Sequence, residues 1–329
     1  MFKVAVFSSK QYDKDFLLAN NHYQELELTF FDSKLTQETV ELANGFDAIS
    51  IFVNDEVDQA VLTQLNHFGI NIIALRCAGF NNIDIEQAQK LNFQLCRVPE
   101  YSPEAVAEHA VGLMLTLSRK FHKAYNRVRD DNFSLDGLMG FNLHEKTVGV
   151  IGTGNIGLAT LKILKGFGCQ LLCHDPIENP LALALGVNYV DLNTLYQNAD
   201  IISLHCPLNV HTAHVINAES LSLMKNNVML INTSRGGLID SKAVLQALKQ
   251  KKIGYLGLDV YELESKLFFE DMSAEIIDDD VFQRFLTFPN VLITGHQGFF
   301  TKEALNTIAK VTLENLDNLL HKKACQNLI

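Results

Sequence analysis

The chain is predicted to be an α/β protein with two doubly wound parallel sheets, and three observations predict this fold class. Short apolar runs of strand character alternate with helical stretches along most of the sequence, as in parallel sheets that are covered by helices. The length of 329 residues is sufficient for two units with separate cores. The composition, 47% hydrophobic and 20% charged residues, is typical of a globular α/β protein.

The first expected unit contains four strands, which are followed by a long helix. The strands are residues 4–7, 48–53, 70–75 and 93–97. The helix spans residues 103–120 and begins with Pro103, a residue that favours the first turn of a helix. Because its centre is apolar on nearly all sides, we expect this helix to be buried on more than one face, either between domains or between subunits.

The second expected unit repeats the alternation of strands and helices. Its strands are residues 148–151, 170–174, 200–205, 228–232, 254–259 and 291–294, and an amphipathic helix follows at residues 302–320. In a parallel sheet the carboxyl ends of all strands lie at one edge, where ligands bind. The residues that follow these strands are therefore the candidates for a functional site.

A glycine motif follows the first strand of the second unit. In the order strand, Gly-x-Gly-x-x-Gly, helix, Gly152 permits a tight turn, Gly154 lets the backbone approach a pyrophosphate, and Gly157 lets the helix pack closely on the sheet. The helix N-terminus directs N–H groups at the phosphates. The next strand ends at Asp175, where a carboxylate binds the adenosine ribose of a dinucleotide. This arrangement predicts dinucleotide binding.

Further polar and reactive residues follow the other strands of this unit and belong to the same edge. They are Cys206 and Pro207, Thr233, Ser234 and Arg235, Asp259, and Gly295 and His296. Two glycines follow Arg235 and leave its planar guanidinium open for bidentate binding of a carboxylate, with a surface salt bridge as the alternative. His296 is the candidate proton donor near neutral pH, with a structural hydrogen bond as the alternative.

A carboxylate beside His296 would stabilise its protonated form. Glu264 and Glu262 both lie in a strongly acidic stretch that continues to Asp280, and a solvated face is the ordinary explanation for any one carboxylate there. The residue pattern alone does not distinguish Glu264 from Glu262.

The charge and the cysteines exclude several other functions. A net charge of −11 argues against nucleic-acid binding, which requires a basic surface. No uninterrupted apolar run approaches the roughly 18 residues of a membrane span, and the first residues contain no cleavable apolar segment. The six cysteines are scattered without a C-x-x-C pair, so we expect no disulfide, no metal site and a cytoplasmic location.

Several blocks together resemble one known family. They are the glycine motif and residues 76–84, 98–109, 232–240, 257–262 and 294–296. With these blocks the chain is identified as a member of the D-isomer-specific 2-hydroxyacid dehydrogenases. Residues 268–271 and the chain length make it most similar to the bacterial fermentative D-lactate dehydrogenases within that family.

The resemblance implies two domains around a cleft. A flavodoxin-like substrate-binding domain would comprise residues 1–100 and 299–329. A Rossmann NAD-binding domain would comprise residues 101–298, with a dimerisation helix at 103–120. The protein would be a homodimer or homotetramer.

The resemblance also implies a reaction and the residues that perform it. NADH would reduce a 2-oxo acid, pyruvate, to D-lactate, with Arg235, Glu264 and His296 as the catalytic residues. Residues expected to contact the substrate are Cys77, Ala78, Gly79, Tyr101, Arg235 and Phe299. Residues expected to contact NAD are Gly152, Gly154, Asn155, Ile156, Gly157, Asp175, Cys206, Pro207, Thr212, Thr233, Ser234 and Asp259.

Two alternative functions are weighed against this one. The first is a dehydrogenase for a larger or branched 2-oxo acid. The second is an NAD-sensing corepressor-like binding protein, which would need peptide-binding extensions that this compact sequence does not show.

Overall fold

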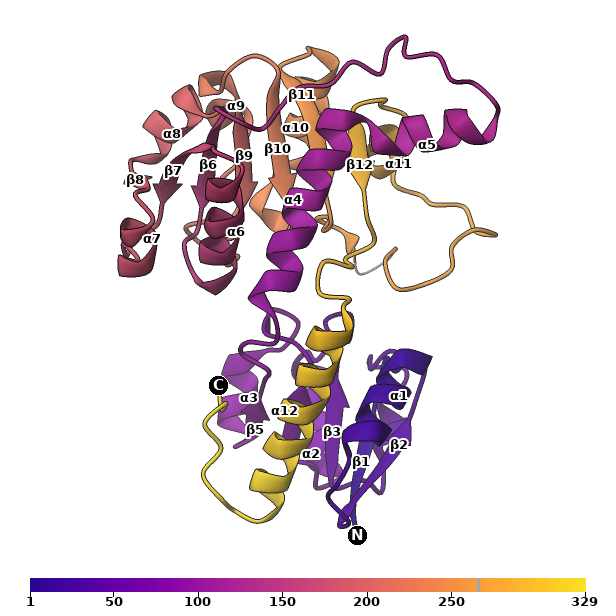
Figure 1. Cartoon of the computed structure of the whole chain (residues 1–329). Coiled ribbons are helices and arrows are strands. Elements are labelled where there is room, and N and C mark those ends of the chain that lie inside the picture. The colour runs from indigo at the N-terminus through magenta and orange to yellow at the C-terminus, as the bar shows by residue number, and fades with distance from the viewer. Residues whose placement is uncertain (265–266) are drawn as a thin grey trace. The chain divides into compact units, whose positions relative to one another are not determined.

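The computed structural model describes residues 1–264 and 267–329, which form two compact units (Figure 1). The first unit contains both ends of the chain, Met1–Ser102 and Phe300–Ile329, and the second is the continuous segment Pro103–Phe299. Each unit has its own parallel sheet.

The sheet of the first unit has five strands in the order β2-β1-β3-β4-β5. The strands are β1 (Phe2–Val6), β2 (Leu26–Phe30), β3 (Ala48–Ile51), β4 (Ile72–Leu75) and β5 (Gln94–Cys96). The helices are α1 (Gln11–Asn20), α2 (Gln59–His67), α3 (Ile85–Lys90) and α12 (Lys302–Leu320), with a short 3-10 helix η1 (Val40–Ala43). The strand order is that of a flavodoxin-like fold.

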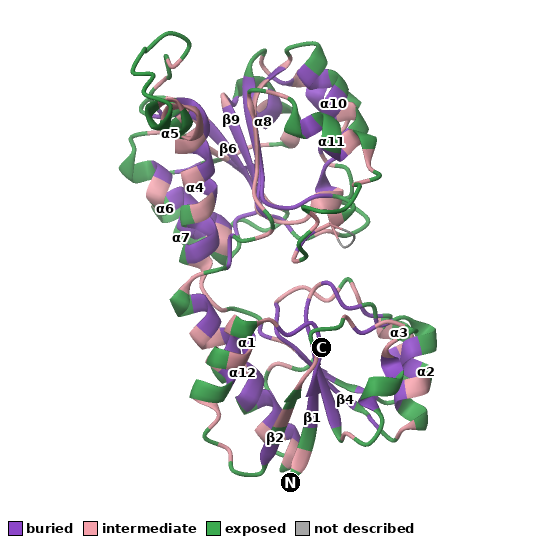
Figure 2. Cartoon of the chain, turned by 90° about the vertical axis from the view of Figure 1, so that its right-hand side faces the viewer, coloured by how far each residue is buried: buried purple, intermediate pink, exposed green. Residues whose placement is uncertain are grey.

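Helices cover both faces of this sheet, with α1 and α12 on one face and α2 and α3 on the other (Figure 2). Leu313 and Leu316 of α12 are buried in the same apolar cluster as Val4 and Val6 of β1. All four residues of β3 and of β4 are buried, because a strand covered on both faces has no solvent side.

The sheet of the second unit has seven parallel strands in the order β12-β11-β10-β9-β6-β7-β8. The strands are β6 (Thr147–Ile151), β7 (Gln170–His174), β8 (Asn188–Tyr189), β9 (Ile201–Leu204), β10 (Val228–Asn232), β11 (Ile253–Leu258) and β12 (Val291–Ile293). The helices are α4 (Pro103–Arg119), α5 (Phe121–Arg129), α6 (Asn155–Gly166), α7 (Pro180–Ala184), α8 (Leu192–Asn198), α9 (Ala218–Leu223), η2 (Gly236–Leu238), α10 (Ser241–Lys249) and α11 (Asp280–Leu286). The strand order reverses between β6 and β9, which is the position where doubly wound sheets bind ligands.

Alternate residues of the central strand β10 pack into two different apolar clusters, one on each face of the sheet. Met229 and Ile231 join the cluster that contains α4 and α6. Val228 and Leu230 join the cluster that contains α8, α10 and α11. The alternation of side chains along a strand therefore produces a three-layer unit with a core on each side of the sheet.

The apolar helix α4 is buried within its own unit. Leu113 and Leu117 are only 3% and 1% exposed, and both lie in one cluster with residues of β6, β9 and β10. The sheet and α6 of the same unit cover these residues. The dimerisation role expected for this helix stays a prediction.

Three elements of the structure were not predicted from the sequence. Lys120 adopts a left-handed conformation with φ 55°, which ends α4 and separates it from the unexpected helix α5. Strands β2 and β8 were also not predicted, and both are edge strands. Among the described residues, no helix is both long and apolar enough to span a bilayer.

Candidate active site

The turn between β6 and α6 has the backbone geometry that its glycines predict. Gly152 has φ +96°, a conformation that side chains other than glycine rarely adopt. A Cβ on Gly157 would clash with the carbonyl oxygen of Gly152. A Cβ on Gly154, by contrast, would meet no atom within 4 Å. Gly152 and Gly157 are therefore packed tightly against neighbouring backbone, whereas the space next to Gly154, at the start of α6, is open.

Asp175 lies beside this turn at the carboxyl end of β7. Its Oδ2 accepts hydrogen bonds from the backbone N and the Oγ1 of Thr153, at 2.7 and 3.2 Å. Asn179 and Tyr189 also bind Thr153, through its carbonyl oxygen and its hydroxyl. The sequence analysis missed these three supporting residues, because they are polar side chains of an ordinary kind and only the fold brings them together.

Arg235 follows β10 in extended conformation and is half-buried. Its guanidinium donates to the carbonyl oxygen of Ser234 at 2.7 Å, and no carboxylate of the described residues lies within ion-pair distance. The surface salt bridge that was the alternative explanation is therefore not present. Gly236 packs against the backbone of Tyr261, where a Cβ would clash. This contact brings the Arg235 turn next to the segment that carries Glu264.

His296 and Glu264 form a direct pair. His296 Nδ1 lies 2.9 Å from Glu264 Oε1, and the side chains are 15% and 21% exposed. Glu264 Oε2 accepts from the backbone N of Tyr261 at 2.9 Å, so both carboxylate oxygens are held. A carboxylate on Nδ1 fixes the ring orientation and leaves Nε2 as the nitrogen that can exchange a proton with a substrate.

The structure shows which of Glu262 and Glu264 lies beside His296, a choice that the residue pattern left open. Glu262 Oε1 lies 2.7 Å from His214 Nε2, and its Oε2 accepts from the backbone N of Ser241. Glu262 therefore pairs with a different histidine, and Glu264 is the neighbour of His296.

The backbone of His296 adopts the left-handed conformation, with φ 54°. Residues other than glycine adopt this conformation less readily, so the contacts around His296 must hold its backbone in place. The rings of Phe269 and Phe299 flank the imidazole at centroid distances of 5.6 and 6.3 Å. The histidine is thus held between two aromatic rings, with its backbone N bonded to the carbonyl oxygen of Asp259 at 2.7 Å.

The buried carboxylate of Asp259 organises the segment on both sides of His296. Its Oδ1 accepts from Thr294 Oγ1 and from the backbone N of Gln297, and its Oδ2 accepts from the backbone N of Gly298. His109 of α4 lies 3.2 Å from the same Oδ1. Burial raises the pKa of Asp259, but the hydrogen bond and charge of His109, with the bonds from Thr294 and Gln297, lower it overall to about 2.

His109 is a site residue that the sequence analysis did not select. It is one of two titratable side chains in the interior of an otherwise apolar helix, and that contrast was the available signal. Its partner Asp259 is far away in the sequence, so only the fold shows why a histidine stands there.

Comparison with known proteins places this geometry in a family. Residues 111–298 match the model of the NAD binding domain of D-isomer specific 2-hydroxyacid dehydrogenases. The chain is 55% identical over 325 residues to D-lactate dehydrogenase of Escherichia coli (strain K12), covering 99% of both chains. The chain belongs to the D-isomer specific 2-hydroxyacid dehydrogenases.

Solved structures of this dehydrogenase family are similar along the whole chain. The apo-structure of D-lactate dehydrogenase from Escherichia coli superposes with a TM-score of 0.90 at 53% identity, covering 99% of both chains. The pyruvate reductase of Chlamydomonas reinhardtii superposes with a TM-score of 0.92 at 43% identity, covering 99% of this chain and 98% of the other. Both sheets of this dehydrogenase are therefore those of its family.

NAD is the cofactor of this dehydrogenase, and the second unit fits it. Gly154 offers open space at the N-terminus of α6, where a pyrophosphate binds. Thr233 Oγ1, at the carboxyl end of β10, is buried without a hydrogen-bond partner in the protein. A buried hydroxyl without a partner is costly, and a bound group at this edge of the sheet would satisfy it.

Asn155 and Ile156, also predicted to contact the cofactor, are the first two residues of α6. Four others, Cys206, Pro207, Thr212 and Ser234, lie in the segments after β9 and β10. Ser234 Oγ donates to the carbonyl oxygen of Cys206 at 2.7 Å, which joins the ends of β9 and β10. Burial raises the pKa of the Cys206 thiol to about 11, so this cysteine is a neutral, structural residue. Thr212 Oγ1 donates to the carbonyl oxygen of Pro207 and closes the loop between them.

The residues predicted to be catalytic or to bind the substrate are divided between the two units. Cys77, Ala78 and Gly79 follow β4 in the first unit, where Arg97 donates to the carbonyl oxygen of Ala78 at 2.7 Å. Tyr101 also belongs to the first unit. Arg235, Glu264, His296 and Phe299 belong to the second.

Proposed function

We propose that this protein is an NAD-dependent D-lactate dehydrogenase that reduces pyruvate to D-lactate. The observation that carries the proposal is the Glu264–His296 pair at 2.9 Å, on the sheet edge that also holds Arg235 and the glycine turn. The identity of 55% to the Escherichia coli D-lactate dehydrogenase, over nearly the whole of both chains, supports lactate as the product.

Arg235 binds and orients the substrate. Its guanidinium makes no ion pair with the described protein residues, so it is available for the carboxylate of a 2-oxo acid. The planar fork binds a carboxylate through two parallel hydrogen bonds and holds the neighbouring carbonyl in one orientation. The reduced nicotinamide, when bound, supplies the hydride for the carbonyl carbon.

His296 supplies the proton. In its protonated form, Nδ1 donates to Glu264 and Nε2 donates to the carbonyl oxygen of the substrate. The negative charge of Glu264 stabilises the imidazolium before transfer. In the reverse direction the neutral ring accepts the proton of the hydroxyl group at the same Nε2.

In the first unit, we assign substrate binding to the backbone of Cys77, Ala78 and Gly79 and to Tyr101. In the second unit, we assign Phe299 to the same role. We assign cofactor binding to the second unit, through the glycine turn, Asp175 and the turns after β9, β10 and β11.

The test is an assay of NADH oxidation with pyruvate, followed by chiral separation of the product. We expect D-lactate in excess and no oxidation without the 2-oxo acid. L-lactate, or no oxidation at all, would overturn the proposal. A higher kcat/KM for 2-oxo-4-methylpentanoate than for pyruvate would instead identify an enzyme for larger substrates of the same class.

We also propose that the enzyme is a cytoplasmic homo-oligomer. Helix α5 and the following segment project from the second unit (Figure 1) and expose large apolar side chains. Tyr125, Val128, Phe133, Leu135 and Met139 are between 51% and 86% exposed. Exposed apolar residues gathered on one segment are typical of an interface, and a second copy of the same chain is the partner we assign to them.

Light scattering tests this assignment. We expect the wild-type mass to be a multiple of the chain mass of 36.8 kDa. Leu135→Asp with Met139→Asp should lower the mass while both sheets stay folded. A monomeric wild type at micromolar concentration would contradict the assignment.

A further inference from the structure

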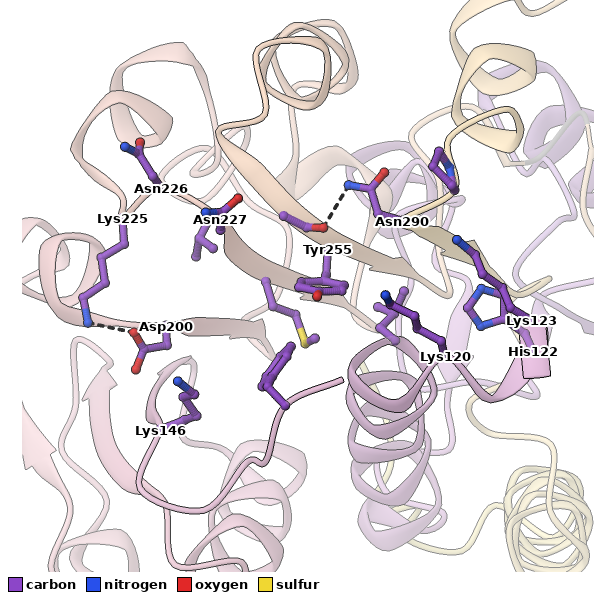
Figure 3. A pocket seen from close by; sticks show the side chains of 16 residues that line it. Lys120, His122, Lys123, Lys146, Asp200, Lys225, Asn226, Asn227, Tyr255 and Asn290 are labelled. Carbon is purple, nitrogen blue, oxygen red and sulfur yellow. Dashed lines mark hydrogen bonds and ion pairs between the residues drawn. The ribbon is translucent and has the colours of Figure 1, made fainter. Parts of the chain in front are cut away.

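A cavity of about 640 Å³ lies in the second unit, away from the candidate active site (Figure 3). It is lined by residues at the amino ends of β6, β9, β10, β11 and β12 and by the junction of α4 with α5. Strand β10 runs from Val228, which lines the cavity, to Asn232 before the Arg235 turn. Five residues of strand separate the two sites by roughly 13 Å along the sheet.

The charge of this cavity is opposite to that of the chain. Four lysines line it, Lys120, Lys123, Lys146 and Lys225, with Asp200 as the one acidic residue among its lining residues. All four lysines are half-buried. The formal charge of the lining residues is thus four positive charges and one negative, or +3, whereas the whole chain carries −11.

On one side of the cavity, two lysines are held in place near Asp200. Lys225 Nζ forms an ion pair with Asp200 Oδ1 at 2.9 Å. Lys146 Nζ lies over the ring of Phe141, 5.8 Å from its centroid, and makes no ion pair with a described carboxylate. On this side the single negative charge of Asp200 faces the two positive charges of Lys146 and Lys225, so the net formal charge is +1.

On the other side, the lysines have no acidic partner among the described residues. Lys120 Nζ donates to the carbonyl oxygen of Gly137 at 2.8 Å, and Lys123 makes no ion pair. Burial, and then the charges of Lys120 and Arg127, lower the pKa of Lys123. His122 Nδ1 is buried without a hydrogen-bond partner in the protein.

Neutral polar groups also line the cavity. The side chains of Tyr255 and Asn290 lie between the two groups of lysines, and Asn226 and Asn227 follow Lys225 (Figure 3). Hydroxyl and amide groups donate hydrogen bonds to anionic oxygens without adding charge. The cavity therefore offers several kinds of donor around a volume of the size that small-molecule sites have.

We propose that this cavity binds a small polyanion with two or more negative charges, a phosphorylated or polycarboxylate metabolite. Lys120 and Lys123 would bind one anionic group, and Lys146 and Lys225 would bind another. A monoanion such as pyruvate carries too little charge to satisfy both sides. The ligand takes no part in the reaction, because the cavity lies at the opposite edge of the sheet from Arg235 and His296.

Calorimetric titration of the full-length protein tests the proposal. Inorganic pyrophosphate and citrate are the probes, in a low-salt buffer without phosphate or divalent cations. NADH and oxamate are present at saturation, so that the phosphate site at the glycine turn and the carboxylate site at Arg235 are both occupied. We expect at least one of the two probes to bind with a stoichiometry of one per chain. If only one probe binds, it identifies the anionic group, phosphate or carboxylate, that the cavity prefers. Binding of neither overturns the proposal.

Lysine variants locate the binding. Lys123→Gln and Lys146→Gln, measured singly and together, should each weaken binding about tenfold, as loss of one charge-assisted hydrogen bond does. Their NADH affinity and thermal midpoint, measured in parallel, establish that the variants are folded. The matched control is Lys162→Gln with Lys249→Gln, which removes two exposed lysines of α6 and α10 outside the cavity. Equal weakening in the control, or unchanged binding in the folded cavity variants, overturns the proposal.

Discussion

His109 Nε2 lies 3.2 Å from Asp259 Oδ1, and this contact joins α4 to the end of β11. Asp259 in turn accepts from the backbone of Gln297 and Gly298. A Cβ on Gly298 would lie 2.9 Å from Asp259 Oδ2, so the segment fits the carboxylate closely. The backbone position of His296 is therefore set by the buried carboxylate of Asp259, which His109 contacts from α4.

The first prediction concerns acid stability. The folded pKa of Asp259, about 2, lies below the unfolded value of about 3.9. Its contribution to stability is therefore complete above pH 4 and is lost as the pH falls through 2. We expect the free energy of unfolding of the wild type to fall by about 2 kcal/mol more than that of Asp259→Asn between pH 5 and pH 2.

Denaturant unfolding at several pH values measures this difference. Asp278→Asn, at an exposed position, is the control and should follow the wild type. Parallel curves for the wild type and Asp259→Asn would show that this carboxylate is not linked to folding.

The second prediction separates the two glutamates by the turnover of pyruvate. In Glu264→Gln an amide replaces the carboxylate that holds His296 Nδ1, so the ring is less well oriented for proton transfer at Nε2. We expect kcat to fall by about tenfold or more, with partial activity retained. Glu262→Gln is the matched control, because Glu262 pairs with His214 and its loss should leave kcat unchanged. A lower kcat in the Glu262 variant instead would reassign the partner of His296.

The third prediction concerns proton transfer. His296→Gln should lower kcat by about 10²- to 10⁴-fold, since a positioned general acid contributes that much. Its affinity for NADH, measured by fluorescence titration, should stay near that of the wild type, because the glycine turn and Asp175 are untouched. Wild-type turnover in this variant would mean that another group supplies the proton.

The fourth prediction concerns the carboxylate. Arg235→Gln should raise KM for pyruvate and also lower kcat, because the guanidinium both binds the substrate and orients its carbonyl. Steady-state kinetics with pyruvate at fixed NADH measures both constants. An unchanged KM would assign carboxylate binding to the backbone of Cys77–Gly79 alone.

The fifth prediction concerns the choice of cofactor. The carboxylate of Asp175 would repel a 2′-phosphate, and Pro176 follows it without an adjacent arginine. NADH should therefore be preferred over NADPH by about tenfold or more in kcat/KM. Asp175→Ser should narrow this preference, although it also removes the bonds to Thr153. Equal efficiency with both cofactors in the wild type would refute the role of Asp175.

Elements with strong local patterns were predicted well from the sequence. Helix α12 was predicted at its observed bounds, 302–320, and β7 and β10 were also predicted as observed. Their apolar periodicity is strong because each packs on the core over its whole length. Strand β8 has only two residues and therefore shows no pattern. Strand β2 alternates Leu26, Leu28 and Phe30 with the polar residues Glu27 and Thr29, a strand pattern that the prediction overlooked.

The site was predicted in part, for a related reason. Glycines and strand ends leave a local signature, so the phosphate turn, Arg235 and His296 were selected from the chain alone. The choice of Glu264 over Glu262 depends on how the acidic stretch turns at Tyr261. The role of His109 depends on a contact between residues 150 positions apart in the sequence. Such contacts follow from packing, and no local pattern encodes them.

The composition of the first unit has a consequence for synthesis on the ribosome. Strands β1 to β5 are made first, but α12, which covers one face of their sheet, is made about 200 residues after β5. At about 5–20 residues per second this is a delay of roughly 10–40 s. The continuous second unit can fold during that time, while the face that contains Val4 and Val6 has α1 but still lacks α12. The nascent chain therefore exposes the part of this apolar face that α12 covers for tens of seconds, and we expect a chaperone to bind it over that interval.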